Sequence, residues 1–250
     1  MSQQVRVEQD LVFAGKAEYT PNVKGNMMME KVYFHDHFLS ALAYSSWVEE
    51  ETNGGTATQT AANGGTVVLT AGATADDDCV EFSHAAQWSG AKNCVMEARL
   101  KLTGITAIGV NVGWLDADMS SNDKIGFELT GVALVNARGA DGAAFVFDTD
   151  GDTDVWYCCA VKAATEKTPA TFTGKTNGAT TAPVAGTYAT FRVALNTAGD
   201  ATYYYNGECV GHQAAVVTAA TLQCPYVALI ARENAAKTVT VDRITCWQDE

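Results

Sequence analysis

The feature that most constrains the fold of this chain is a strict two-residue alternation of apolar and polar side chains. In residues 93–102 every second side chain is apolar, namely Cys94, Met96, Ala98, Leu100 and Leu102. The places between them are mostly charged and hold Glu97, Arg99 and Lys101. Because successive side chains of a β-strand point to opposite faces, this spacing buries one face and leaves the other in solvent. The segment is therefore predicted to be a strand of an antiparallel sheet.

Similar segments recur along the chain, separated by residues rich in Gly and Asn. We expect strands at 66–70, 79–83, 93–102, 108–114, 124–130, 143–148, 154–161, 187–195, 201–205, 208–211, 226–231 and 238–247. Asn206-Gly207 has the residue types of a tight hairpin turn, and Asn-Gly-Gly-Thr at 53–56 and 63–66 predicts two more hairpins. A change of phase after Val241 predicts a β-bulge near Asp242-Arg243. A short helical turn, anchored by Trp47, is expected within 39–51.

A dozen short strands with almost no helical period favour an all-β fold, a sandwich of two antiparallel sheets. The chain has 250 residues, 47% of them hydrophobic, which is enough for one sizeable core. No Pro-rich linker divides it, so residues 32–250 are predicted to form a single domain. Residues 1–31 show no sustained period and are predicted to be an extended N-terminal arm.

Three segments carry a resemblance to a known superfamily: residues 34–38 (FHDHF) followed by Trp47, the strand–turn–strand 201–210 (ATYYYNGECV), and the closing strand 239–244 (VTVDRI). They resemble the concanavalin A-like (laminin-G-like) jelly roll, over roughly residues 32–250. With an arm and no secretion signal, the chain is similar in style to lectin-like structural proteins of tailed bacteriophages, such as capsid decoration proteins and fibre domains. The resemblance implies a jelly-roll sandwich that forms symmetric oligomers, with trimers suited to three-fold positions.

The charge balance excludes some partners. There are 16 basic and 29 acidic residues, a net charge of -13, which disfavours binding to a nucleic-acid backbone. No apolar run reaches the roughly 18 residues of a membrane span. The first residues lack the basic-then-apolar layout of a secretory signal, so synthesis and folding in a cytoplasm are expected.

The seven cysteines contain no Cys-x-x-Cys pair, so neither a zinc knuckle nor a redox pair is indicated. Most lie within strand patterns, where a free thiol behaves as a small apolar group. Buried free thiols and disulfides formed later outside a reducing cell both remain open.

The densest acidic cluster is Asp148, Asp150, Asp152 and Asp154, with Gly151 at its centre. Carboxylates at every second place could supply oxygen ligands to calcium. The spacing is not that of an EF-hand, and Asp-Gly between two strands is equally a hairpin signal. A calcium site and a plain acidic turn both remain open.

No catalytic pattern is present. Glucanases of this fold carry alternating acids on one strand, whereas Glu97 alternates with Arg99 and Lys101 here. There is no Gly-x-Ser-x-Gly elbow and no phosphate loop. His35 and His37 would share a strand face, but no third metal ligand follows nearby, which favours a structural role. Two interpretations remain open for the aromatic residues of the strands: they stack on sugar rings, or they fill the core. These residues are Trp88, Trp114, Trp156 and Tyr203–Tyr205.

These features predict a non-enzymatic protein that requires no cofactor, with calcium as a possible ligand, and the resemblance implies a viral structural protein. By its resemblance it would be a capsid decoration (cement) protein on the virion exterior, made in the host cytoplasm. Its partners would be the major capsid protein and copies of itself, as a homotrimer. The arm residues expected to make these contacts are Tyr19, Met27, Met28 and Met29, since methionines adapt to varied surfaces. The alternative is a calcium-dependent, glycan-binding lectin-like module of a fibre or cell-surface protein, with calcium held by the four aspartates.

Overall fold

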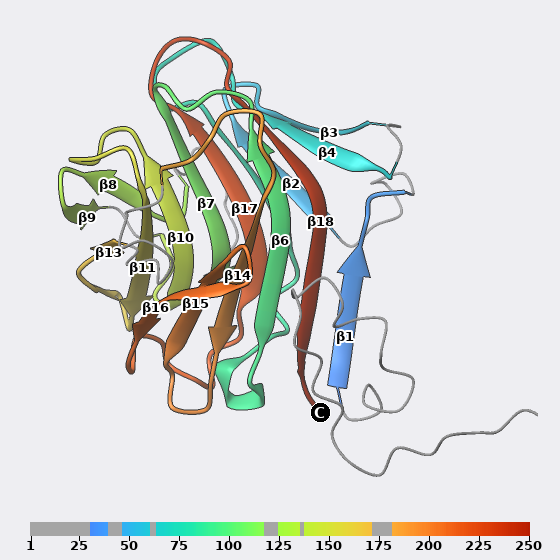
Figure 1. The fold of residues 1–250 in the computed structure, drawn as a ribbon, viewed down its shortest axis with the longest axis vertical. Coiled ribbons are helices and arrows are strands. Elements are labelled where there is room, and N and C mark those ends of the chain that lie inside the picture. The colour runs from blue at the N-terminus through green and yellow to red at the C-terminus, as the bar shows by residue number, and fades with distance from the viewer. Residues whose placement is uncertain (1–30, 40–46, 61–63, 118–124, 136–137, 172–181) are drawn as a thin grey trace, which may run out of the picture.

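The computed structural model describes residues 31–39, 47–60, 64–117, 125–135, 138–171 and 182–250. These residues form two stacked antiparallel sheets, with sheet A in front and sheet B behind it in Figure 1. The predicted all-β, two-sheet sandwich is thereby confirmed. Residues 1–30 lie outside the described part, so the predicted arm and its contact residues Tyr19, Met27, Met28 and Met29 stay predictions. No helix of the described part is long and apolar enough to cross a membrane.

Sheet A has eight strands. Its order is β16 (Glu208–Gln213), β15 (Ala201–Tyr205), β14 (Ala189–Leu195), β6 (Val95–Leu102), β18 (Thr238–Asp249), β4 (Thr66–Thr70) and β3 (Thr56–Thr60), and β1 (Lys31–Asp36) also pairs with β18. The strand β1 begins one residue before the predicted domain boundary. The long strand β18 thus has β6 on one side and both β4 and β1 on the other.

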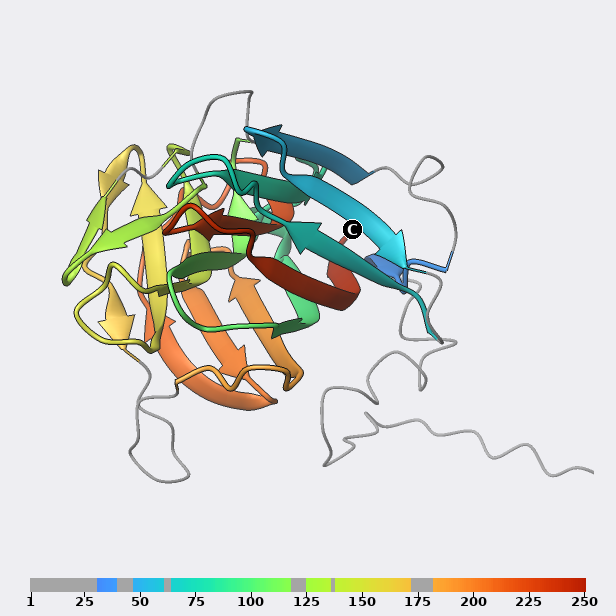
Figure 2. The same ribbon diagram turned by 90° about the horizontal axis from the view of Figure 1, so that it is seen from above.

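Sheet B also has eight strands. Its order is β12 (Thr165–Glu166), β11 (Trp156–Lys162), β10 (Gly142–Asp148), β7 (Ile108–Leu115), β17 (Cys224–Ala231), β5 (Cys79–His84) and β2 (Trp47–Thr52), and β13 (Ala170–Thr171) pairs with β11. A separate hairpin is formed by β8 (Glu128–Thr130) and β9 (Ala133–Val135). The short 3-10 helix Gly90–Lys92 precedes β6. Seen from above, the sheets form two layers (Figure 2).

The main core lies between the sheets and is rich in aromatic rings. Trp156 and Phe145, from sheet B, each pack against Phe191 of sheet A. The indole nitrogen of Trp114 crosses the interface and donates a hydrogen bond of 3.0 Å to the carbonyl of Val193. Each large ring buried in this way contributes about 1.5–3 kcal/mol, so this layer is the main source of stability.

Strand β6 follows the alternation that the sequence predicts. Met96, Ala98, Leu100 and Leu102 point into the core. The charged set between them lies on the outer face of sheet A, although Glu97 is largely buried among its neighbours. Strands β7, β10 and β17, by contrast, are buried along their whole length, and their sequences are accordingly near-continuous runs of apolar and small residues.

The expected local features are partly confirmed. Asn206 and Gly207 both have positive φ, as a tight hairpin between β15 and β16 requires. The register of β18 against β6 shifts between Val241 and Arg243, which is the predicted bulge. The turn at 63–66 connects the antiparallel pair β3 and β4, although residues 61–63 lie outside the described part.

Two local expectations differ from the structure. Residues 47–51 of the expected helical turn lie in strand β2, which pairs with β5, and residues 40–46 lie outside the described part. The turn at 53–55 links β2 of sheet B to β3 of sheet A, so it is a crossing between layers and not a hairpin.

All seven cysteines are free thiols, and Cys209 alone among them is exposed. Burial raises the pKa of several buried thiols, for example that of Cys158 and of Cys246. Of the two alternatives, buried free thiols describe this structure.

Candidate functional site

The outer face of sheet B is closed by the chain's own residues. Phe127 and Leu129 from the β8–β9 region pack with Tyr226 and Ile230 of sheet B in a second apolar cluster. The side-chain amide of Asn111 holds this segment against sheet B. It donates a hydrogen bond of 3.0 Å to the carbonyl of Phe127 and accepts one of 2.7 Å from the N–H of the same residue. The described side chains of this second cluster are therefore buried beneath the chain's own cover.

A buried arginine gathers the acidic side chains at one end of this cover. The guanidinium of Arg232 donates to both carboxylate oxygens of Asp148, at 3.0 and 2.6 Å, and to Glu128 at 3.0 Å. It also contacts Asp77 at 2.6 Å and Asp150 at 3.5 Å. Burial by itself would lower the pKa of Arg232, but Asp148 and Glu128 outweigh it and raise that pKa, so the guanidinium stays charged. We call these five residues the Arg232 cluster.

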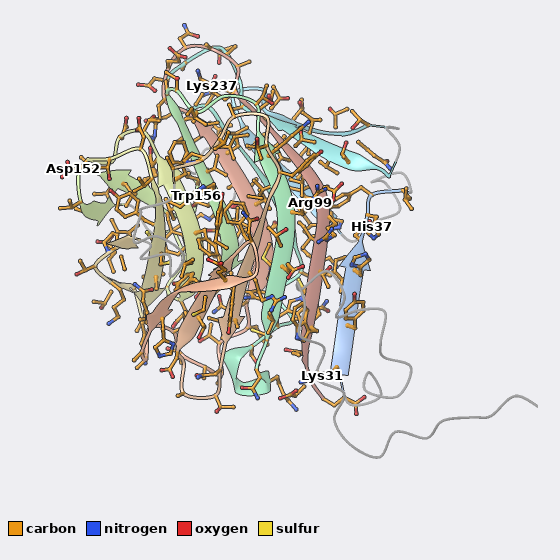
Figure 3. All side chains as sticks on the ribbon, in the orientation of Figure 1. Lys31, His37, Arg99, Asp152, Trp156 and Lys237 are labelled. Atoms are coloured by element: carbon orange, nitrogen blue, oxygen red, sulfur yellow. The ribbon has the colours of Figure 1, made fainter. Side chains whose placement is uncertain are left out.

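The four aspartates predicted to bind calcium do not converge. Asp148 is fully buried and held by Arg232, whereas Asp150, Asp152 and Asp154 are exposed (Figure 3 labels Asp152). In the described ranges no three His, Cys, Asp or Glu side chains are grouped so as to hold a metal ion. The run forms the turn between β10 and β11, as the plain-turn interpretation predicts. Calcium binding stays an untested prediction.

A second buried ion pair involves Glu81, another acidic residue of sheet B. Arg138 contacts Glu81, whose side chain is fully buried, and also donates 3.2 Å to the carbonyl of Ala117. A glycosidase needs two carboxylates open to the sugar bond. Glu81, Glu128 and Asp148 are instead buried against arginines.

The outer face of sheet A faces the viewer in Figure 1, and several side chains of its central strands are half-buried, among them Arg99, Arg192 and Arg243. The strand registers align its side chains in rows. One row contains His35, Thr245, Glu97, Arg192, Tyr204 and Cys209. The neighbouring row contains Tyr33, Trp247, Val95, Ala194, Thr202 and His212. In the row on the opposite side of the first, Arg243 of β18 lies directly opposite Arg99 of β6. We call this surface the A face.

The A face is a network of arginines, aromatic rings and two acids. Arg192 donates twice to one oxygen of Glu97, at 3.0 and 2.7 Å, and lies over the rings of Tyr204 and Trp247. Arg99 pairs with Asp242 at 2.8 Å and lies 4.2 Å from the ring centre of Tyr188. Lys101 lies over the same ring at 4.9 Å. Cation–π contacts of this kind fix the rings and cations relative to each other.

The aromatic residues considered for sugar stacking are divided between core and surface. Trp88, Trp114 and Trp156 are fully buried, so they are core residues. Tyr203 is also buried, and Tyr204 is partly exposed on the A face. Trp247, which no sequence pattern marked as a surface residue, is partly exposed, although the other four tryptophans, all described, are buried.

The two histidines of the N-terminal strand region contact each other. Their ring centres are 4.1 Å apart, and Nδ1 of His35 lies 2.6 Å from the hydroxyl of Thr245. Burial, followed by His37 and Arg243, lowers the pKa of His35. Asp36 accepts hydrogen bonds from the N–H of Phe38 and the indole of Trp47. These contacts agree with the structural role that the missing third ligand favoured.

The fold places the chain among proteins built on the concanavalin A-like jelly roll, the sandwich of lectins and glucanases. The carbohydrate recognition domain of Emp47p superposes with a TM-score of 0.58 at 12% identity, covering 90% of this chain and 100% of that domain. Peanut lectin gives 0.56 at 13% identity, with 87% and 97% covered.

A β-1,3-glucanase from Mycobacterium marinum gives 0.53 at 14% identity, with 86% and 97% covered. No protein-family model and no curated protein sequence matches the chain. At these identities the similarity establishes the shared fold, which carries both binding proteins and enzymes.

The residues of the A face could have been found in part from the sequence. Arg99, Lys101 and Arg192 occupy the polar phase of predicted strands, so their outward direction follows from the alternation. That Arg243 shares their face depends on the bulge, which shifts the phase of β18 by one residue. The pairing of these strands has no local sequence signal.

Proposed function

We propose that this protein is a non-enzymatic binding protein that attaches to its partner through the A face. The observation that carries this proposal is the contrast between the two outer faces. Sheet B is covered by the chain itself and its acids are held by Arg138 and Arg232. Sheet A presents Tyr204, Trp247 and several arginines at its surface. Tyrosine, tryptophan and arginine are the residue types enriched at protein interfaces and their hot spots.

The role that we assign to this binding is capsid decoration. It comes from the resemblance to phage structural proteins, and it is supported by the two-sheet body and by the pairing of the sheet B acids Glu81 and Asp148 with arginines. The partners would be the major capsid protein and further copies of the chain, arranged as a trimer on the virion exterior. A specific contact of this type buries about 800 Å² per partner, an area that one sheet face can supply.

Purified virus particles test this assignment directly. Immunogold labelling should place the chain outside the capsid, and washed particles should retain it. Light scattering should give three times the chain mass of 26.5 kDa in solution. A genome context without capsid genes, or particles that do not contain the chain, would contradict the decoration role.

The second candidate is a glycan-binding protein. It is favoured by the fold shared with a carbohydrate recognition domain and with a lectin. Because Asp148 is committed to Arg232, we propose no requirement for calcium in this alternative. A glycan array probed with and without chelator separates the candidates, since a decoration protein should give no saturable sugar signal.

A further inference from the structure

The A face has the opposite charge balance to the rest of the chain. It carries Arg99, Lys101, Arg192 and Arg243 against Glu97 and Asp242, whereas the whole chain has 16 basic and 29 acidic residues. A basic surface on an acidic protein directs negatively charged partners to one place and repels them elsewhere. The charge distribution therefore points to an acidic partner.

The two acids of the A face do not satisfy its four cations. Arg192 donates both of its hydrogen bonds to Oε2 of Glu97, and Arg99 forms an ion pair of 2.8 Å with Asp242. Arg243 lies 3.7 Å from Glu97 and 3.9 Å from Asp242, which is longer than a hydrogen bond. Its Nη2 is buried and makes no hydrogen bond with any described residue. The side chain of Arg243 as a whole is 17% exposed, so an outside acceptor can reach its exposed part but not the buried Nη2.

The strand register adds to this excess of donors. Arg243 and Arg99 are direct cross-strand partners, and like charges placed opposite each other destabilise a sheet. Lys101, on the same strand as Arg99, forms no ion pair within the described part and contacts the ring of Tyr188. Asp242 already lies near both arginines, and a partner's carboxylate beside the exposed parts of these three cations would reduce their repulsion further.

The aromatic rings of the A face favour an acidic protein segment over a sugar. Tyr188 already has Arg99 and Lys101 over its ring, and Arg192 lies over Tyr204 and Trp247. Sugar stacking uses a free ring face, which these cations occupy in part. Carboxylate side chains instead use the edge donors that stacked guanidinium groups leave free.

We propose that the A face, around Arg99, Lys101 and Arg243, docks an acidic segment of a protein partner. This inference rests on the proposed docking function and names the chemistry that its partner must present. In Figure 3, Arg99 lies on the A face, and Lys237 lies at the far upper end of the molecule, away from it. Lys237 is therefore a suitable position for a control substitution.

The test uses the full chain and fluorescein-labelled poly-L-glutamate, followed by fluorescence anisotropy at low salt. The wild type should bind saturably despite its net charge of -13, and binding should weaken at about 0.5 M NaCl, where charges are strongly screened. Arg243→Gln and Lys101→Gln should each bind roughly tenfold more weakly, as the loss of one charge-assisted hydrogen bond implies. Lys237→Gln removes the same charge and should bind as the wild type does, and thermal melts confirm that each variant is folded.

Unsaturable binding, or equal affinity of all three variants, would overturn the assignment. Tighter binding of polygalacturonate than of poly-L-glutamate would overturn it in favour of an acidic glycan. Particle binding of the same variants separates this inference from the decoration role. If Arg243→Gln still binds particles as the wild type does, the decoration role is supported but the A face is not its binding surface. If the wild type binds poly-L-glutamate but no particles, the A face binds acidic segments and the decoration role is refuted.

Discussion

Replacing Arg232 with methionine tests how the Arg232 cluster is held together. Methionine keeps the long apolar stem of the side chain but removes the charge and all the donors. In the wild type the side chains of Asp148 and Glu128 are 0% and 5% exposed and both contact this guanidinium. The substitution would leave two carboxylates under the β8–β9 cover without their cation.

The expected loss of stability follows from burial. Breaking a buried ion pair by removing one partner costs about 3–5 kcal/mol, because the other charge stays desolvated. The outer members Asp77 and Asp150 are 35% and 53% exposed, so water screens them and they add little. We expect Arg232→Met to lose about 4 kcal/mol, on the order of 10 °C in Tm for a domain of this size.

Urea unfolding followed by the fluorescence of the buried tryptophans measures this difference. The matched control is Lys237→Met, whose partner Glu233 is 49% exposed, and it should lose less than about 1 kcal/mol. Adding Asp148→Asn to Arg232→Met should restore part of the loss, because it removes one of the stranded charges. A loss in Arg232→Met no larger than that of the control would refute the buried-charge reasoning.

Three further outcomes are expected. Ellman's reagent should label one thiol rapidly in the native protein, that of Cys209, and none in Cys209→Ser; several fast thiols would contradict the packing. Calcium at millimolar concentration should not raise the Tm of the wild type, because Asp148 is occupied, but should stabilise Arg232→Met, whose freed carboxylates can bind it. Because the pKa of His35 is lowered from 6.5, the unfolded chain binds its proton first as the pH falls. The free energy of unfolding should therefore decrease below about pH 7, and His35→Gln should flatten that slope in urea titrations.

The strands with clean alternation could be predicted from the sequence, because a one-residue slip would turn every apolar side chain to solvent. Strand β4 has the predicted bounds, 66–70, and the bulge in β18 lies where its phase changes. Strand β2 was missed because three successive glutamates give no alternation, and only the edge of β5 explains its conformation.

The candidate site was harder to predict because it consists of pairings between distant strands. The acidic run 148–154 looked like a site, yet its first residue pairs with Arg232, which is 84 positions away. The A face likewise depends on the contact of Arg192 with Glu97, residues 95 positions apart. A single sequence carries no local signal for such contacts, whereas it does show which way each side chain points.

The position of β18 in sheet A has a consequence for the order of folding. Every strand of sheet B lies before residue 232, so that sheet can form its hydrogen bonds while β18 is still missing. Sheet A, by contrast, stays divided until residues 238–249 join the β14–β6 pair to the β3–β4 pair, and the register that joins Lys31 of β1 to Asp249 closes a very long loop. Such non-local pairing is slow, and unpaired strand edges promote aggregation in the meantime. Synthesis that stops before β18 should therefore yield insoluble protein rather than a smaller folded domain.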